Sequence, residues 1–123
     1  MAEQQYAFDL FFADFRFFVR DPGGTFTILN MPRLTPAEGW VHIAGTYDGA
    51  TQEMRLYKNG ILTNSTNTAV TTLNNVTQPV SLGAGDVPSG GAAYGGAMDE
   101  LRFWNVVRTQ SEIRENMHLT LKG

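Results

Sequence analysis

The segment WVHIAGTYDG at residues 40–49, followed by EMRLYKNG at residues 53–60, has the alternating pattern of β-strands. The first strand is expected to end at Asp48-Gly49. In the second segment, Asn59-Gly60 separates a strand from a further short strand over residues 61–63. Asn-Gly between two such runs is the strongest short-range sign of a β-hairpin, because both turn positions favour positive φ. The centre of the chain therefore predicts antiparallel β-structure.

The β pattern continues toward the N-terminus. Residues 6–20 predict two strands with a break at Ala13-Asp14, and apolar side chains, mostly phenylalanine, fall on both faces. A strand that is apolar on both faces is usually covered on both sides. Residues 21–24 (Asp-Pro-Gly-Gly) predict a turn, because proline fixes φ and glycine supplies positive φ, and a return strand is expected over residues 25–29.

The C-terminal third predicts short strands followed by one helix. Strands are expected over residues 80–83 and 97–105, separated by a Gly-rich loop over residues 85–96. Residues 109–112 (Thr-Gln-Ser-Glu) form a capping-box pattern, in which the hydroxyl and the glutamate satisfy free backbone amides. This box is expected to open a helix over residues 110–117.

Composition and charge fit one globular domain and exclude several classes of partner. Of 123 residues, 42% are hydrophobic and 17% charged, so we expect one core. The formal net charge of −3 gives no general attraction to nucleic acid or to anionic lipid. The longest apolar stretch is interrupted by Asp9, Asp14 and Arg16, so no membrane span is expected. Residues 1–5 lack the pattern of a signal peptide, and the absence of cysteine removes thiolate and disulfide chemistry.

Four segments and the capped helix, taken in order, resemble the laminin-G-like domains of the concanavalin A-like lectin/glucanase kind. The segments are residues 40–49 (Trp-led, ending Tyr-Asp-Gly), 54–60 (Leu-Tyr, closed by Asn-Gly), 80–84 (Leu-Gly) and 96–105 (Asp-Glu, ending in Trp-Asn). The resemblance covers about residues 6–117. It implies an all-β fold for residues 1–123, an antiparallel jelly-roll sandwich with one short C-terminal helix. It also implies an extracellular or cell-surface location and buried positions for Trp40 and Trp104.

The chain departs from this family pattern at its N-terminal end. Similar domains begin with several further strands, including an Asp-Gly-rich segment, and no such strands precede Tyr6. A sandwich without them leaves strand edges and an apolar face open, which folded proteins avoid. Self-association is therefore expected to complete the sandwich, and Phe18→Asp is expected to disrupt it. The residues expected between chains are Phe11, Phe12, Phe17 and Phe18.

The pattern of ionisable residues argues against catalysis. Retaining glycoside hydrolases need two carboxyl groups about 5–5.5 Å apart, which on one strand means residues two or four apart. Asp99 and Glu100 are adjacent, so their side chains point to opposite faces. His42 and His118 are each isolated in the sequence. The chain is therefore not expected to be an enzyme, and glycoside hydrolysis is the third and least favoured function.

Calcium is the one cofactor for which the sequence offers ligands, because oxygen atoms at loop rims suit this hard cation. In domains that this chain resembles, the aspartate of the late Asp-Glu strand holds a structural ion, and Asp99 occupies that position. Asp48, Asp86 and Asp21 are alternative ligands at the loop rims. Aspartate is also common beside turns for local hydrogen bonding, so a purely structural role for these residues is the competing interpretation.

Two functions remain open for this fold. The first is a non-catalytic module that binds a glycan or a protein through its loops, where aromatic faces stack on sugars and amides bind hydroxyl groups. The expected ligand-binding residues are Tyr47, Asn59, Asp86 and Tyr94. The second is a structural subunit that forms a homo-oligomer and binds no small ligand.

Overall fold

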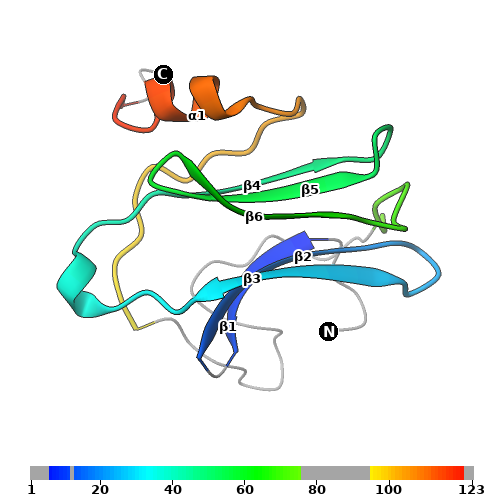
Figure 1. Cartoon of the computed structure of the whole chain (residues 1–123), viewed down its shortest axis with the longest axis horizontal. Coiled ribbons are helices and arrows are strands. Elements are labelled where there is room, and N and C mark those ends of the chain that lie inside the picture. The colour runs from blue at the N-terminus through cyan, green and yellow to red at the C-terminus, as the bar shows by residue number, and fades with distance from the viewer. Residues whose placement is uncertain (1–5, 12, 76–94, 121–123) are drawn as a thin grey trace.

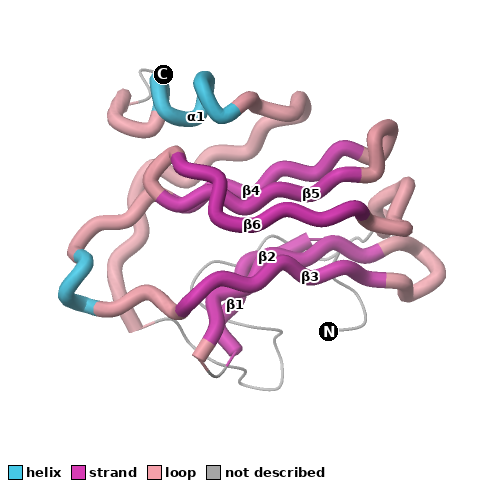
Figure 2. Tube along the Cα trace, viewed as in Figure 1, coloured by secondary structure: helices cyan, strands magenta, loops and turns pink. Residues whose placement is uncertain are grey.

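The computed structural model describes residues 6–11, 13–75 and 95–120, and within them two three-stranded antiparallel sheets face each other (Figures 1 and 2). Sheet A contains β1 (Tyr6–Phe11), β2 (Asp14–Arg20) and β3 (Phe26–Pro32), in that order. Sheet B contains β4 (Ile43–Asp48), β5 (Glu53–Lys58) and β6 (Ile61–Asn67). A 3₁₀ helix, η1 (Pro36–Glu38), connects the sheets, and α1 (Gln110–Asn116) follows them. The expected antiparallel sandwich with a short C-terminal helix is confirmed.

The register of sheet A explains its two apolar faces. Phe8 lies opposite Phe17, and Phe17 lies opposite Leu29, so these side chains share the inner face toward sheet B. Phe18 lies opposite Ile28 and belongs to the outer face. The predicted break near Ala13 is confirmed, whereas β3 extends to Pro32, beyond the expected end at Leu29.

The predicted Asn-Gly hairpin joins β5 to β6. Asn59 and Gly60 both have positive φ, 51° and 74°. A Cβ atom at position 60 would collide with Arg114 of α1, so glycine here also permits close approach of the helix. Strand β6 continues to Asn67, four residues beyond the predicted end.

The core lies between the sheets. Sheet A contributes Phe17, Val19, Leu29 and Met31, and sheet B contributes Met54 and Leu56. Val70 follows β6 and closes the same cluster. Hydrogen bonds also join the sheets along the β3–β6 side: the Asn64 side chain donates to the Asn30 carbonyl at 2.9 Å, and the Thr27 and Thr68 hydroxyls are 2.7 Å apart.

Helix α1 lies on the side of sheet B that faces away from sheet A (Figure 1). Its capping box is formed as predicted, with the Thr109 hydroxyl accepting a hydrogen bond from the Glu112 amide at 3.2 Å. The helix is attached to β6 by the Leu62 amide, which donates to the Gln110 side chain at 2.8 Å. Ile113 is its buried residue. No helix within the described residues is long and apolar enough to cross a membrane.

Four expectations about the tryptophan segments are wrong. Strand β4 begins at Ile43, because the chain turns at Gly39 (φ 67°) and reaches the sheet only after residue 42. Trp40 therefore lies outside the strand and is 71% exposed. Residues 97–105 form no strand, since Glu100 has a φ of 52° and interrupts the extended backbone, and Trp104 is exposed as well. The strand expected over residues 80–83 lies outside the described residues.

The phenylalanines expected between chains are not available to a partner where the structure describes them. Phe17 is 5% exposed and Phe18 is 2% exposed within a single chain. The assignment of these two residues to an intermolecular surface is therefore wrong, because the domain itself covers both faces of β2. The side chain of Phe11 and all of Phe12 lie outside the described residues.

Candidate functional site

A hollow of about 230 Å³ lies on the outer face of sheet B, beside the chain that leads into α1. We call it the β4–β5 hollow. Its first wall is the sheet, with Thr46, Asp48, Thr51, Glu53, Arg55 and Tyr57, and its second wall is the segment 107–109.

Strand register brings the polar side chains of the first wall together. Thr46 is paired with Arg55, and Asp48 is paired with Glu53. Side chains directly opposite each other in an antiparallel pair lie on the same face, and alternation along β5 adds Tyr57 to that face. Tyr57 is buried and contributes to the base of the hollow, whereas Arg55 and Glu53 are partly exposed above it.

Each wall of the hollow carries a guanidinium that a neighbouring carboxylate holds in place. Arg55 donates to both oxygens of Glu53, at 2.9 and 3.0 Å. Hydrogen bonds with Tyr57 and with Glu53 raise the pKa of Arg55. On the second wall, Arg108 donates to Glu112 at 3.0 Å, and its guanidinium carbon lies 3.6 Å from the centre of the Trp104 ring. Hydrogen bonds from Arg108 and then from Thr109 lower the pKa of Glu112.

Asp48 and Glu53 are two neighbouring carboxylates that lie opposite each other on two different strands. Both already accept hydrogen bonds from the chain. Asp48 Oδ1 accepts from the Ala50 and Thr51 amides at 2.9 and 3.2 Å, and Glu53 accepts from Arg55. The hollow therefore combines hydroxyl groups, two arginine side chains fixed by ion pairs, and two carboxylates that accept hydrogen bonds.

Tyr47 does not face this hollow. It lies on the inner face of β4, and its hydroxyl donates to the Val70 carbonyl at 2.9 Å. Burial raises the pKa of this phenol. Tyr47 thus connects sheet B to the chain after β6, and the prediction that it binds a ligand at a loop is not supported by its position.

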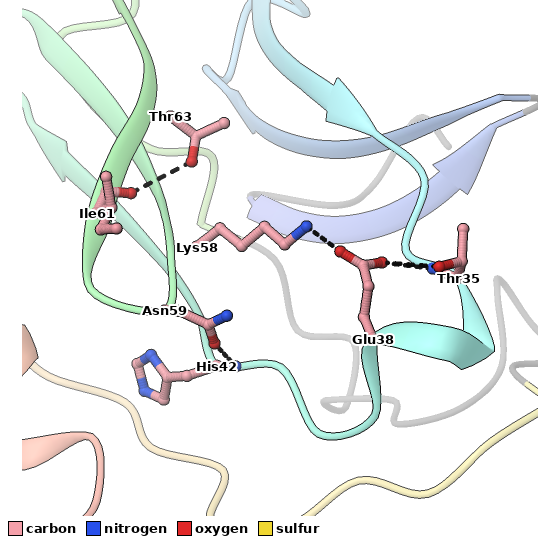
Figure 3. A network of polar contacts seen from close by, with 7 residues as sticks. All are labelled: Thr35, Glu38, His42, Lys58, Asn59, Ile61 and Thr63. Carbon is pink, nitrogen blue, oxygen red and sulfur yellow. Dashed lines mark hydrogen bonds and ion pairs between the residues drawn. The ribbon is translucent and has the colours of Figure 1, made fainter.

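Asn59 also has a structural contact in place of an open binding position (Figure 3). Its side-chain oxygen accepts a hydrogen bond from the His42 backbone amide at 3.0 Å. The Asn59 backbone amide donates to the His42 carbonyl at 2.8 Å. Beside it, Lys58 forms an ion pair with Glu38, and Glu38 accepts from the Thr35 amide at 2.6 Å. These contacts fix the β5–β6 turn against the chain around η1. The other two expected ligand residues, Asp86 and Tyr94, lie outside the described residues.

The predicted calcium residues each accept hydrogen bonds from backbone amides of their own segment. Asp99 Oδ1 accepts from the adjacent Glu100 amide at 2.8 Å, and Asp48 Oδ1 is used by two amides of its own turn. Calcium requires about six to eight oxygen ligands. Within residues 6–11, 13–75 and 95–120, no group of three or more histidine, aspartate or glutamate side chains is placed to hold a metal.

His42 makes the stability of this region depend on pH. Burial, followed by the positive charges of Arg102 and His118, lowers the pKa of His42. A histidine in the unfolded chain has a pKa of about 6.5, so the folded chain favours the neutral imidazole. Its contribution to stability is therefore complete above about pH 6.5 and is lost as the pH falls through the lower pKa of the folded state. We expect His42→Gln to lose less stability than the wild type between pH 7.5 and 5, measured by urea unfolding.

His118→Gln keeps His42 and removes one of the two charges that lower its pKa, so it should reduce the loss of stability by less than His42→Gln does. The comparison is between the slopes of the wild type and the two variants. An unchanged slope in His42→Gln would show that this imidazole does not carry the effect.

Comparison with known proteins adds one finding. A laminin G-type family model, described as the concanavalin A-like lectin/glucanases superfamily, matches residues 2–114. No curated protein and no solved structure matches the chain. The matched range includes the six strands found in the described residues and extends into α1 (Gln110–Asn116).

Proposed function

Because the chain belongs to the concanavalin A-like lectin/glucanase superfamily, we propose that it is a non-catalytic module that binds a glycan or a protein at the β4–β5 hollow. The observation that supports this proposal is that the carboxylates of the hollow are already hydrogen-bonded within the chain. Its two central carboxylates, Asp48 and Glu53, already act as acceptors, while the walls around them present hydroxyl groups and guanidinium edges.

The groups that line the hollow suit recognition of a polar ligand. Thr46 and Thr51 each supply a hydroxyl that both donates and accepts, and guanidinium groups supply donors in a fixed plane. Val107 is exposed on the second wall and offers an apolar contact. The volume of about 230 Å³ is below the roughly 300–1,000 Å³ of pockets that enclose drug-sized ligands. The hollow therefore fits one sugar ring or one amino-acid side chain.

The same contacts argue against glycoside hydrolysis. A general acid must hold a proton that it can deliver to the leaving oxygen, and its partner must be free to attack or to activate water. Arg55 engages both oxygens of Glu53, which stabilises the ionised form. Asp48 binds the turn that connects β4 to β5. Neither carboxylate is placed to donate a proton.

We expect Thr51→Trp to fill the hollow and to reduce ligand binding at least tenfold, while folding is retained because Thr51 is exposed. The matched control is Thr25→Trp. Both threonines are exposed turn residues whose amide donates to a preceding aspartate, Asp48 for Thr51 and Asp21 for Thr25. Binding is measured on a glycan array and on a displayed peptide library, and hits are titrated with both variants.

Two results would contradict the proposal. If Thr51→Trp binds the same ligands as strongly as Thr25→Trp does, the hollow is not the site. If bound oligosaccharides release new reducing ends on incubation with the wild type, and Glu53→Gln stops this release, the domain is an enzyme.

Self-association is a second candidate function, favoured by apolar side chains that one chain leaves exposed. Tyr6 and Phe8 lie on the inner face of sheet A but are 41% and 44% exposed, and Phe103 beside them is 57% exposed. Tyr6 and Phe103 are neighbours, with ring centres 6.2 Å apart, and contiguous exposed apolar patches mark protein-interaction sites. Light scattering over a concentration series tests for association.

A further inference from the structure

One charged side chain in the wall of the β4–β5 hollow has no ion-pair partner within the described residues. Arg55 is paired with Glu53, and Arg108 is paired with Glu112, so each of these cations is neutralised by its own carboxylate. Asp48 forms no ion pair in this part of the chain, so the hollow carries one uncompensated negative charge. An anionic ligand would meet that charge without gaining an arginine that is not already paired.

The carboxylate of Asp48 uses one oxygen for the fold and leaves the other available. Its Oδ1 accepts hydrogen bonds from the Ala50 and Thr51 amides at 2.9 and 3.2 Å, whereas none of the described residues donates to its Oδ2. The hydroxyls of Thr46 and Thr51 line the same hollow and likewise have no hydrogen-bond partner among those residues. The hollow thus offers three oxygen acceptors to a ligand.

Three acceptors beside one uncompensated negative charge match a primary ammonium group. An ammonium group carries a positive charge and three N–H donors, and it has no acceptor of its own. A guanidinium group fits less well, because it pairs best with both oxygens of a carboxylate at once. In Asp48, Oδ1 is already occupied by the two amides. The hollow therefore suits a lysine-type cation better than an arginine-type cation.

The surroundings of the hollow favour the side chain of a protein lysine over an amino sugar. Exposed apolar side chains lie on the second wall, with Val107 in the lining and Trp104 and Val106 in the chain that leads to it. A lysine packs its hydrocarbon stem on apolar surface while its ammonium group stays with polar partners. An amino sugar would place hydroxyl groups against these apolar side chains. The volume of about 230 Å³ suits one such stem.

We propose that the β4–β5 hollow binds a lysine side chain of a partner protein, with the ammonium group held by Asp48 Oδ2 and the hydroxyls of Thr46 and Thr51. This proposal rests on the proposed function and names the chemical group that the same hollow takes. The formal net charge of −3 favours the approach of a basic partner.

The probe for this proposal is Nα-acetyl-lysine amide, titrated into the isotope-labelled domain and followed by NMR. The Ala50 amide is the reporter, because it donates to Asp48 Oδ1 and its proton responds to a cation bound at the other oxygen. We expect saturable shifts at Ala50 and Thr51, and weaker binding in high salt. The same compound with an acetylated side-chain amine should produce no such shifts, since acetylation removes the charge. This comparison needs no variant.

Asp48→Asn should raise the dissociation constant of the lysine probe about 3- to 30-fold, because the charge is lost while an oxygen remains for the turn. Asp21→Asn is the matched control. Asp21 is also partly exposed, and its Oδ1 accepts from the Thr25 amide at 2.9 Å in a similar turn. This control changes the net charge equally and should bind the probe as the wild type does. Circular dichroism checks that both variants fold.

Three results would overturn the lysine proposal: no saturable shift at Ala50 and Thr51, an equal response to the acetylated probe, or equal affinity of Asp48→Asn and Asp21→Asn. Tighter binding of glucosamine than of the lysine probe would overturn it in favour of an amino sugar. None of these results removes the hollow as a binding site, because Thr51→Trp tests the hollow with ligands of any charge. A lysine probe that binds Thr51→Trp as tightly as Thr25→Trp would overturn both proposals.

Discussion

Phe18→Asp is expected to prevent the domain from folding, and not merely to alter its association. Phe18 is 2% exposed on the outer face of β2. A carboxylate at this position would be buried without a partner, which costs about 4 kcal/mol or more. Loss of the buried phenylalanine ring costs about 3–5 kcal/mol in addition. Small domains are stable by only about 5–15 kcal/mol. We expect loss of the β-sheet circular dichroism signal and of the cooperative urea transition.

Phe26→Asp is the matched control for this substitution. Phe26 lies in the same sheet, on β3, but is 54% exposed, with the Arg20 guanidinium carbon 5.5 Å from its ring centre. An aspartate there remains hydrated and close to a cation, so a change of no more than about 1 kcal/mol is expected. A folded Phe18→Asp protein with altered oligomeric state would restore Phe18 to an intermolecular surface.

The burial of Phe17 and Phe18 could be predicted from the sequence, but not which chain covers them. The alternating pattern placed apolar residues on both faces of β2, and such strands are covered on both sides. The pattern does not distinguish covering by the same chain from covering by a neighbour. Exposure instead occurs on β1, at Tyr6 and Phe8, whose position at the edge depends on the order of strands in the sheet.

The error at residues 97–105 has a different physical origin. Alternation of apolar and polar residues is compatible with a strand, but a strand also needs a neighbour and an unbroken extended backbone. The positive φ of Glu100 breaks that extension, and glutamate is not a residue from which positive φ is expected. Trp104 accordingly remains at the surface, where its ring contacts Arg108.

The site was partly predictable. Once β4 ends at Asp48 and β5 begins at Glu53, a four-residue turn places these two residues opposite each other. Alternation relates carboxylates along one strand, whereas this pair lies across two strands. The second wall of the hollow, residues 107–109, depends on where α1 docks, and that position is set by long-range contacts such as the one between Leu62 and Gln110.

The Tyr-Asp-Gly end of β4 leads to the second prediction with a large effect, which concerns Gly49. A Cβ atom at this position would lie 2.5 Å from the Thr71 carbonyl oxygen and 2.8 Å from the Tyr47 hydroxyl. The first contact is with backbone, which cannot rotate away as a side chain can. We therefore expect Gly49→Ala to lower the free energy of unfolding by about 1–3 kcal/mol, as overpacked core positions do, measured by urea unfolding.

Gly95→Ala is the control, because a Cβ atom at residue 95 would have no neighbour within 4 Å. It reports the general effect of replacing glycine by alanine, which reduces the freedom of the unfolded chain and by itself stabilises. Relief of the collision would move the Tyr47 hydroxyl or the chain near Thr71. The loss of stability in Gly49→Ala therefore also includes weakening of the hydrogen bond from Tyr47 to Val70. If Gly49→Ala is as stable as Gly95→Ala, the chain after β6 does not pack against the end of β4.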